Sequence, residues 1–419
     1  MRVDLRYGEE FLPLDLSDRF TIEQVAPQVV TKHPNISSEL LRVIESPIDS
    51  QPFSRRVSEV DSIAIVVNRI EQVVLIEELL NSLLNSVDTF AFNPDNVSII
   101  YPADERISKI DVDECLGNPE SRGHMLILHN PKNEASLKFI GETPSHSTPV
   151  QINEAYLCAD LKIGLADIRP DLFYGATGGR MSVNPSVSGN RTIHRNAKLR
   201  TSGLIGPFEM ETPSCIDLLE TSQLAGLDFI VNAVTDWHGN LAHIVAGNPI
   251  SSWTYGVNNA LRLAKADFNR RADIAIVSAG GQSHDATLYD AIDCLHSAYA
   301  VTEHGGSIVL VAECSEDIGP RGFLRGMSEF SSAEDLITTS ETNFELGMEK
   351  SRFFWEILGS RNVVICSRLR DSLVKERLHC TPASDPQEGF EVAQGMLASS
   401  KKVAILYDGV RTTPKLSRN

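Results

Sequence analysis

Short apolar runs rich in β-branched residues recur along the chain, and segments long enough for a helix separate them. The run Ser62 to Val67 (SIAIVV) has the composition of a buried strand, and Ile70 to Val87 then shows apolar residues at helical spacing. Further strands are expected at Val97 to Tyr101, Met125 to His129 and Lys162 to Ala166. Strands that alternate with helix-length segments favour a largely parallel sheet. The sequence therefore predicts an α/β fold.

One pair of apolar runs is expected to form a hairpin. Leu227 to Trp237 and Asn240 to Val245 flank His238-Gly239, a polar turn. His238 and His243 are expected to be structural, because a turn histidine and a strand histidine need no ligand.

A second series of strands follows the charged segment FNRRAD at 268–273. Its strands are expected at 274–278, 307–311, 362–366 and 403–407, and its helices at 286–301, 349–358 and 388–399. A chain of 419 residues is long for one core, so two domains are expected. They are residues 1–270 and 271–400, each with a mainly parallel Rossmann-like sheet flanked by helices, and a cleft between them. The strand within 402–419 either returns to the first domain or closes the second sheet.

Charge and composition limit the partners. The composition, 42% hydrophobic and 22% charged, is that of a globular protein, and the formal net charge of −18 opposes binding to nucleic acid or an anionic membrane. A small anionic molecule remains a suitable partner, because a local pocket can be basic in an acidic protein. No interface signature in the sequence sets an oligomeric state.

The opening residues and the cysteines point to the cytoplasm. MRVDLRYGEE carries charge where a signal peptide needs an apolar stretch, and no apolar run is long enough to cross a bilayer. Seven scattered cysteines without a CxxC pair suit buried thiols in a reducing compartment rather than disulfides or a zinc site.

A glycine-rich segment, FYGATGGRMSVNP at 173–185, is the most informative motif. Gly175, Gly178 and Gly179 allow a sharp turn that presents backbone N–H groups, and Arg180 adds a fixed positive charge. Such a turn can hold a phosphate or a carboxylate. The alternative is that these glycines only permit the fold.

The pattern FxGxxGGRxSVxP in this segment resembles the signature loop of the nickel-pincer lactate racemase family. The resemblance extends along the chain. Its other landmarks are Tyr7-Gly8, Ser46-Pro47-Ile48, AGNP at 246–249, Gly280-Gly281, HGGSIVLVAEC from His304 and ILYDG from Ile405.

The resemblance implies two α/β domains with the active site between them. It also implies a racemase or epimerase of 2-hydroxy acids, whose nickel-pincer nucleotide accepts the substrate hydride and returns it to the opposite face. In this family a lysine tethers the cofactor covalently, one histidine ligates nickel and two histidines act as acid and base.

This sequence departs from the family pattern at those positions. The resemblance places the tethering lysine at Met181 and the nickel-ligating histidine at Ala197, although His194 lies three residues earlier. It places the two acid/base histidines at Asp171 and Glu105. Because a thioether cannot form the covalent link of an amine, any cofactor is expected not to be covalently bound.

Two further places in the sequence also depart from the family pattern. The family's Asp-His-Thr-Arg-Pro strand end corresponds to residues 68–72 here (NRIEQ), and a substrate-contacting lysine corresponds to Asp293. Six changed functional positions argue against pincer catalysis, and the cofactor identity stays open.

These considerations select candidate site residues of three kinds. Carboxylates would need a raised pKa to replace imidazoles as acid and base, or they can ligate a hard divalent ion. The candidates are Asp171 and Glu105 for catalysis; Gly178, Gly179, Arg180 and Ser182 for cofactor binding; and Arg106, Arg169, His284, Asp285 and Tyr289 for substrate binding. Capping is the alternative role of Asp285, and a structural role is the alternative for His284.

Three functions therefore remain open. The first is a 2-hydroxy-acid racemase with an untethered cofactor. The second is a nickel-independent enzyme that uses Glu105 and Asp171. The third is a noncatalytic protein that binds a small anion or a nucleotide.

Overall fold

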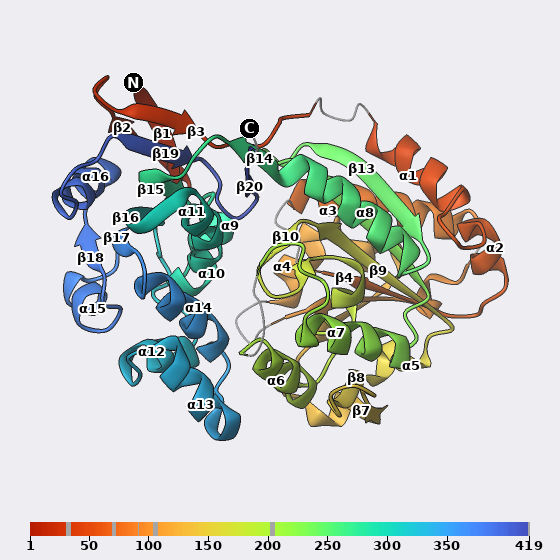
Figure 1. Cartoon of the computed structure of the whole chain (residues 1–419). Helices are drawn as coiled ribbons and strands as arrows, with labels where there is room; N and C mark the ends of the chain where they lie inside the picture. Colours follow the sequence, from red (N-terminus) through yellow and green to blue (C-terminus); the bar gives the residue numbers. More distant parts are fainter. Residues whose placement is uncertain (31–34, 69–72, 91, 104–107, 202–205, 418–419) are drawn as a thin grey trace.

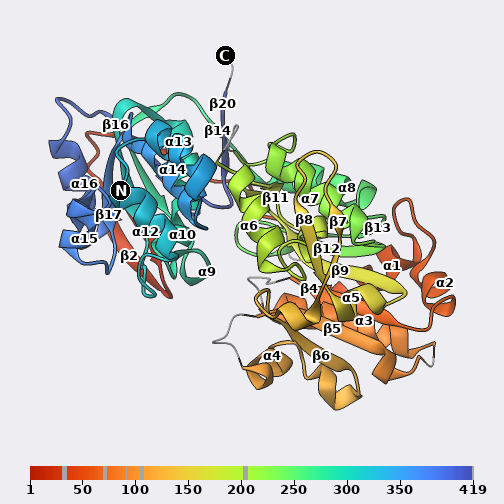
Figure 2. The same cartoon turned by 90° about the horizontal axis from the view of Figure 1, so that it is seen from below.

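The computed structural model describes residues 1–30, 35–68, 73–90, 92–103, 108–201 and 206–417. The chain forms two lobes that lie side by side, each built on a sheet with helices against it (Figure 1). The larger lobe contains most of the first 260 residues. The smaller lobe contains the N-terminal strands, and the described C-terminal end lies between the two lobes (Figures 1 and 2).

The larger lobe contains a six-stranded sheet in the order β13-β12-β9-β4-β5-β6. Its strands are β4 (Ile63–Val67), β5 (Val97–Pro102), β6 (Met125–His129), β9 (Leu161–Ile168), β12 (Phe229–Thr235) and β13 (Leu241–Gly247). All neighbours are parallel except β12 and β13, which form an antiparallel hairpin. Every residue of β4 is buried, as expected of a strand covered on both faces.

Helices cover both faces of this sheet, and one of two small hairpins packs apolar residues of β8 against it. The helices are α1 (Ile36–Glu45), α2 (Phe53–Ser58), α3 (Val73–Asp88), α4 (Lys109–Cys115), α5 (Glu154–Cys158), α6 (Asn190–Leu199), α7 (Pro213–Leu224) and α8 (Ser251–Ala264). The single turns are η1 (Pro94–Asn96), η2 (Pro119–Arg122), η3 (Glu134–Ser136) and η4 (Gly179–Ser182). The hairpins are β7 (Leu137–Glu142) with β8 (Pro149–Asn153), and β10 (Pro170–Asp171) with β11 (Gly175–Ala176).

The smaller lobe contains a second six-stranded sheet, in the order β18-β17-β16-β15-β19-β3, and all its pairs are parallel. Its strands are β3 (Thr21–Gln24), β15 (Ala272–Ser278), β16 (Thr302–Val311), β17 (Asn362–Cys366), β18 (Thr381–Ala383) and β19 (Lys402–Leu406). The hairpin of β1 (Arg2–Tyr7) and β2 (Glu10–Asp15) packs its apolar side against this sheet. A parallel pair, β14 (Lys265–Phe268) and β20 (Thr413–Leu416), lies between the lobes (Figure 2).

The helices of the smaller lobe are shorter on average. They are α9 (Gln282–Asp285), α10 (Leu288–Ala291), η5 (Ile292–Cys294), α11 (Leu295–Val301), α12 (Arg321–Ser328), α13 (Ala333–Asn343), α14 (Met348–Leu358), α15 (Asp371–Glu376) and α16 (Pro386–Gly395). The single helix expected at 286–301 begins at Leu288, because Thr287 caps α10 with a side-chain bond to the Asp290 amide, and the turn η5 then separates α10 from α11.

The structure confirms the α/β fold and the strands expected in both series, together with the hairpin at His238-Gly239. The strand near the end of the chain, β19, joins the second sheet between β15 and β3. The division of the chain at residue 270 stays a prediction, and it would separate β3 from β19, its partner in that sheet. The sequence alone does not reveal that pairing, because it joins residues almost 400 positions apart.

Two further expectations concerned buried cysteines and helices long enough to cross a membrane. Cys215, Cys294, Cys314, Cys366 and Cys380 are buried as expected, whereas Cys115 and Cys158 are exposed. None of the helices in the described ranges is long and apolar enough to span a bilayer.

Candidate functional site

A pocket of about 410 Å³ lies at the carboxyl edge of the larger sheet. In doubly wound folds this edge is where ligands bind. Residues at or just after the ends of β9, β4, β5 and β6 line it, together with residues from η4 and α6. They are Asn68, Pro102, Ala103, His129, Pro131, Asp167, Arg169, Thr177, Met181, Pro185, Ser186 and Ile193.

Among the described residues that line the pocket, the charged pair is Asp167 and Arg169, which form an ion pair. Arg169 Nε lies 3.3 Å from Asp167 Oδ2, and the two side chains are 23% and 9% exposed. Thr177 fixes the backbone beneath the pair, because its hydroxyl donates to the Asp167 carbonyl (2.8 Å) and accepts from the Arg169 amide (3.0 Å). The Trp253 indole in turn donates to the Thr177 carbonyl (2.9 Å). The pair is therefore presented to the pocket from a rigid strand end.

Asn68 lines the pocket directly after β4, the strand next to β9. Its backbone amide continues the ladder by donating to the Leu165 carbonyl (2.9 Å), and its side-chain oxygen is in contact with the Ser186 hydroxyl. That hydroxyl also lies 2.8 Å from the Met181 carbonyl. Asn68 thus ties the end of β4 to the segment that carries Met181.

His129 lines the pocket but has both ring nitrogens engaged. Nε2 lies 2.9 Å from the Ser188 carbonyl, and Nδ1 lies 3.1 Å from the Asn153 amide nitrogen. Asn153 caps α5 through its side-chain oxygen, so its nitrogen is oriented as the donor to Nδ1, and Nε2 carries the proton. Burial lowers the pKa of His129. The neutral His129 ring therefore forms part of the pocket wall.

Gly178 and Gly179 of the glycine-rich turn pack away from the pocket. A Cβ on Gly178 would lie 2.7 Å from Ile168 Cγ1, and one on Gly179 would lie 2.9 Å from Trp253 Cδ1. The Gly179 amide donates to Asn232 (3.1 Å). These two glycines let the turn lie directly on β9 and α8, which is the packing role that the sequence left as an alternative.

Arg180 and Ser182 point away from the pocket as well. The Arg180 guanidinium stacks 3.9 Å from the Trp253 ring centroid and donates to the Cys215 carbonyl (3.2 Å). Burial lowers the pKa of Arg180 to about 10. Ser182 is fully buried against Gly164, so Met181 is the one residue of η4 among the described pocket-lining residues.

Asp171 lies in the tight turn between β10 and β11. Its Oδ1 accepts the backbone amides of Phe173 (2.9 Å) and Tyr174 (2.8 Å). The turn directs Leu172 and Phe173 into the hydrophobic core of the smaller lobe. Asp171 therefore stabilises a contact between the lobes.

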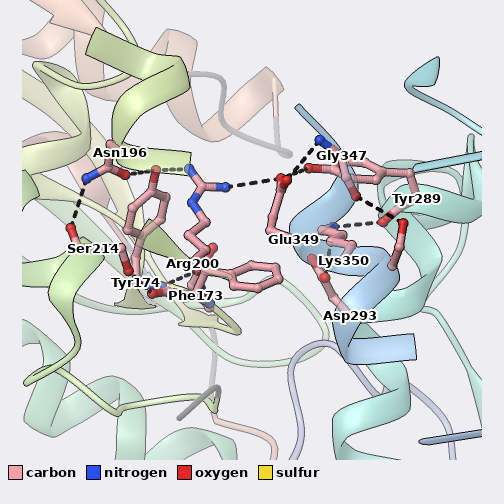
Figure 3. A network of polar contacts seen from close by, with 12 residues as sticks. Phe173, Tyr174, Asn196, Arg200, Ser214, Tyr289, Asp293, Gly347, Glu349 and Lys350 are labelled. Carbon is pink, nitrogen blue, oxygen red and sulfur yellow. Dashed lines mark hydrogen bonds and ion pairs between the residues drawn. The ribbon is translucent and has the colours of Figure 1, made fainter. Parts of the chain in front are cut away.

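A chain of polar contacts crosses from one lobe to the other beside this turn (Figure 3). The Tyr174 hydroxyl donates to Asn196 (2.9 Å) and is in contact with the Arg200 guanidinium. On the far side, Glu349 accepts from the Tyr289 hydroxyl (2.8 Å). Burial and the Glu349 carboxylate raise the pKa of Tyr289 well above its usual value.

Asp293 belongs to the same interface. Its carboxylate lies 2.8 Å from Lys350 Nζ, which also donates to the Tyr289 carbonyl (2.7 Å) (Figure 3). Burial raises the pKa of Asp293, and Lys350 opposes that shift.

His284 and Asp285 are buried within the smaller lobe. Asp285 Oδ2 accepts the backbone amides of Gly8 (2.8 Å) and Glu313 (3.1 Å), which ties the β1–β2 turn to the end of β16. Neither residue lines the pocket at Arg169.

The structure thus distributes the sequence candidates over several places. Arg169 lines the pocket, Asp171 and Tyr289 lie at the contact between the lobes, and the others described lie in packing positions. Glu105 and Arg106 lie outside the described residues, and the assignments as a whole stay predictions. Sequence reasoning missed Asp167 and His129, although both are polar residues at carboxyl ends of buried strands. Within the described ranges, no three His, Cys, Asp or Glu side chains are grouped closely enough to hold a metal ion.

Fold and site together define a two-domain α/β protein with a ligand-sized pocket at the carboxyl edge of a parallel sheet. The family model described as lactate racemase N-terminal domain matches residues 7–203, and the lactate racemase C-terminal domain matches residues 268–413. The chain belongs to the lactate racemase family.

The chain is also similar to curated proteins over nearly its whole length, and it shares its fold with solved structures. The lactate racemase of Thermoanaerobacterium thermosaccharolyticum is 23% identical over 97% of this chain and 98% of its own length. That of Lactiplantibacillus plantarum is 24% identical over the same shares. The structure of the lactate racemase apoprotein from Thermoanaerobacterium thermosaccharolyticum has a TM-score of 0.88 at 22% identity and covers 99% of this chain and 100% of that one. A Thermotoga maritima protein has a TM-score of 0.68 at 12% identity and covers 93% and 100%.

Proposed function

We propose that this protein binds a small carboxylate of the 2-hydroxy-acid type in the pocket at Arg169, without a covalently tethered nickel-pincer nucleotide. The observation that carries the proposal is the Arg169 guanidinium, which lines the pocket at the carboxyl edge of the sheet. A guanidinium is planar and always charged, and it matches the geometry of a carboxylate. The curated relatives are named lactate racemases, which supports the ligand class.

The residues present do not fit the tethered nickel group. Met181 lines the pocket at the position to which the resemblance assigns the tethering lysine, and a thioether cannot form that bond. Ala197 is fully buried where the resemblance assigns the nickel-ligating imidazole, and a methyl group offers no lone pair. His194, one helical turn away, packs its ring 5.0 Å from that of Phe344 in the smaller lobe.

The residues that would replace the family's acid and base are engaged elsewhere or lie outside the described ranges. Asp171 Oδ1 accepts two backbone amides in its turn, which gives this carboxylate a structural role. Asp293, which the resemblance places at the family's substrate-contacting lysine, forms an ion pair with Lys350. These contacts argue against a nickel-independent reaction that uses Asp171 and Glu105. They favour a protein that binds its ligand without pincer hydride transfer.

The test combines mass spectrometry with ligand binding. Protein purified from its native source is expected to have the intact mass of the polypeptide alone, with no stoichiometric nickel by elemental analysis. Isothermal titration with D-lactate and L-lactate is expected to show binding that Arg169→Gln abolishes. Arg191→Gln is the control, since Arg191 is an exposed arginine on α6 that does not line the pocket. A covalent nucleotide adduct, or equal binding by Arg169→Gln, would contradict the proposal.

A further inference from the structure

One contact between the lobes is built from two helices, and we call it the α6–α14 seam. The second half of α6 and the two residues after it meet α14 and the segment just before that helix. The seam residues are His194, Arg200 and Thr201 from the larger lobe and Phe344, Glu349 and Arg352 from the smaller lobe. They form a ring contact, an ion pair and a hydrogen bond, so three kinds of interaction join the lobes at one place.

The charged side chains of the α6–α14 seam have partners within the chain. Glu349 is fully buried, pairs with Arg200 (3.8 Å) and accepts from the Tyr289 hydroxyl (2.8 Å). Arg352 is 11% exposed and donates through Nη1 to the Thr201 carbonyl (2.9 Å). A buried charge is tolerated only when it is paired and hydrogen-bonded. The contact between the lobes therefore needs no ligand charge to complete it.

Lys350, the residue after Glu349, has its partners within the smaller lobe. Its Nζ lies 2.8 Å from Asp293, donates to the Tyr289 carbonyl (2.7 Å) and lies 4.2 Å from the centroid of the Tyr289 ring. The two labelled cations in Figure 3, Arg200 and Lys350, thus each lie beside a carboxylate of this chain.

An apolar insertion lies beside the seam. Leu172 and Phe173 belong to the turn between β10 and β11 of the larger lobe, and both are buried in the hydrophobic core of the smaller lobe. Asp171 holds this turn by accepting the Phe173 and Tyr174 amides. The Arg200 guanidinium lies 4.3 Å from the centroid of the Tyr174 ring, so the insertion and the seam are adjacent. Separation of the lobes would return Leu172 and Phe173 to water, which is unfavourable.

A second set of contacts joins the lobes elsewhere along the chain. Arg411, which follows β19, donates to the Trp237 carbonyl (3.2 Å) just after β12. The Tyr407 ring lies 6.2 Å from that of Trp237. The pair of β14 and β20 also lies between the lobes (Figure 2). A rotation that opens the α6–α14 seam must therefore turn about these contacts or break them.

We infer that the two lobes are closed in the ligand-free protein, and that the α6–α14 seam and the Leu172–Phe173 insertion hold them closed. Two-lobed binding proteins often close around a ligand, because the ligand adds contacts that favour the closed state. In this chain its own side chains make those contacts. The inference goes beyond the proposed function, because it holds whether or not the pocket at Arg169 binds a carboxylate.

Hydrogen exchange followed by mass spectrometry tests the inference on ligand-free wild-type protein. Peptides that cover residues 170–176 and 348–353 are expected to exchange about a hundredfold or more slowly than an unstructured chain, because the closed lobes bury both segments. Addition of D-lactate or L-lactate is expected to leave both rates unchanged.

A paired substitution removes the ion pair without leaving a buried charge. Arg200→Met with Glu349→Gln makes both side chains neutral, and the glutamine oxygen still accepts from the Tyr289 hydroxyl. Exchange at residues 348–353 is expected to rise about tenfold or more, while the circular dichroism spectrum stays that of the folded protein. The matched control is Arg55→Met with Glu59→Gln, which removes an exposed pair on α2 and is expected to leave exchange at the seam unchanged.

Two results would overturn the inference. The first is fast exchange of both peptides in ligand-free wild-type protein that lactate then slows, because the lobes would be open until a ligand closes them. The second is equal exchange at the seam in the paired variant and in its control. If the paired variant does not fold, the wild-type measurement decides alone. If lactate does not bind at all, the proposed function fails, and slow exchange in the wild-type protein still supports closed lobes.

Discussion

Arg200, at the end of α6, lies 3.8 Å from Glu349, in the first turn of α14, so an ion pair joins the two lobes. Glu349 is fully buried, and its oxygens also accept from the Tyr289 hydroxyl and the Gly347 amide (2.8 Å each). A buried carboxylate is tolerated only when it is paired and hydrogen-bonded in this way. The contact therefore adds a buried polar link between the lobes to the apolar one that Leu172 and Phe173 make (Figure 3).

Arg200→Met is expected to destabilise the protein by about 3 to 5 kcal/mol, because it leaves the Glu349 charge buried without its cation. Urea unfolding followed by circular dichroism measures the change. Arg55→Met is the matched control: the Arg55–Glu59 pair on α2 is exposed, with side-chain exposures of 63% and 55%. Its loss should cost less than about 1 kcal/mol. Similar losses in the two variants would contradict the bridging role of Arg200.

Phe173→Ala is expected to cost about 3 to 5 kcal/mol, as large apolar truncations in a core do. Phe173 is 6% exposed and packs in the core of the smaller lobe, although it belongs to the turn after β10. Small-angle scattering is expected to show a larger radius of gyration, since the turn no longer anchors the lobes. Phe139→Ala, at a position 57% exposed on β7, should change stability by less than about 0.5 kcal/mol. An unchanged radius with Phe173→Ala would argue that other contacts hold the lobes.

Gly178→Ala is expected to destabilise by about 1 to 3 kcal/mol or more. Gly178 has a φ of +92°, and an added Cβ would meet Ile168 and the Asp167 carbonyl. Displacement of Asp167 should also weaken carboxylate binding at Arg169. Gly395→Ala is the control, because Gly395 ends α16 and nothing lies within 4 Å of an added Cβ. That change should be neutral or stabilise by up to about 1 kcal/mol. Equal effects of the two alanines would contradict the packing role of the turn.

Stability is expected to fall as the pH is lowered from about 6.5 towards about 4. Burial lowers the pKa of His296 to about 4, whereas a histidine in the unfolded chain has a pKa near 6.5. In this window the unfolded state binds a proton that the folded state does not bind, so folding stability is present above pH 6.5 and is lost as the pH falls. Urea unfolding between pH 7.5 and 4.5 measures the slope.

His296→Gln isolates this contribution. The variant is expected to show a flatter pH dependence than wild type, by up to about 1.4 kcal/mol per pH unit. His129, whose pKa burial also lowers, keeps its own contribution in both proteins. Identical slopes would show that His296 is protonated in the folded state.

The sequence predicted the strands well, whereas its assignment of site residues stays a prediction. Buried parallel strands such as β4 consist of consecutive β-branched residues, so their positions follow from local composition. Arg169 was a candidate because it is a cation near a glycine-rich turn, and it does line the pocket. Gly178, Gly179, Arg180 and Ser182 were expected to face a ligand, and none of these four is among the residues that line the pocket. The packing of Gly179 on Trp253 joins residues from distant segments, which no local pattern reveals.

By itself, the amino-acid sequence determined the α/β class, the order of strands and helices, and the acidic surface charge, because these depend on neighbouring residues and on composition. Tertiary structure alone decided that β3 completes the second sheet, that Asp167 pairs with Arg169 in a pocket, and that Arg200 meets Glu349 across the lobes. The physical reason is that these three features depend on tertiary packing. Packing brings together segments that are far apart in the sequence, and no local sequence pattern indicates which segments will meet.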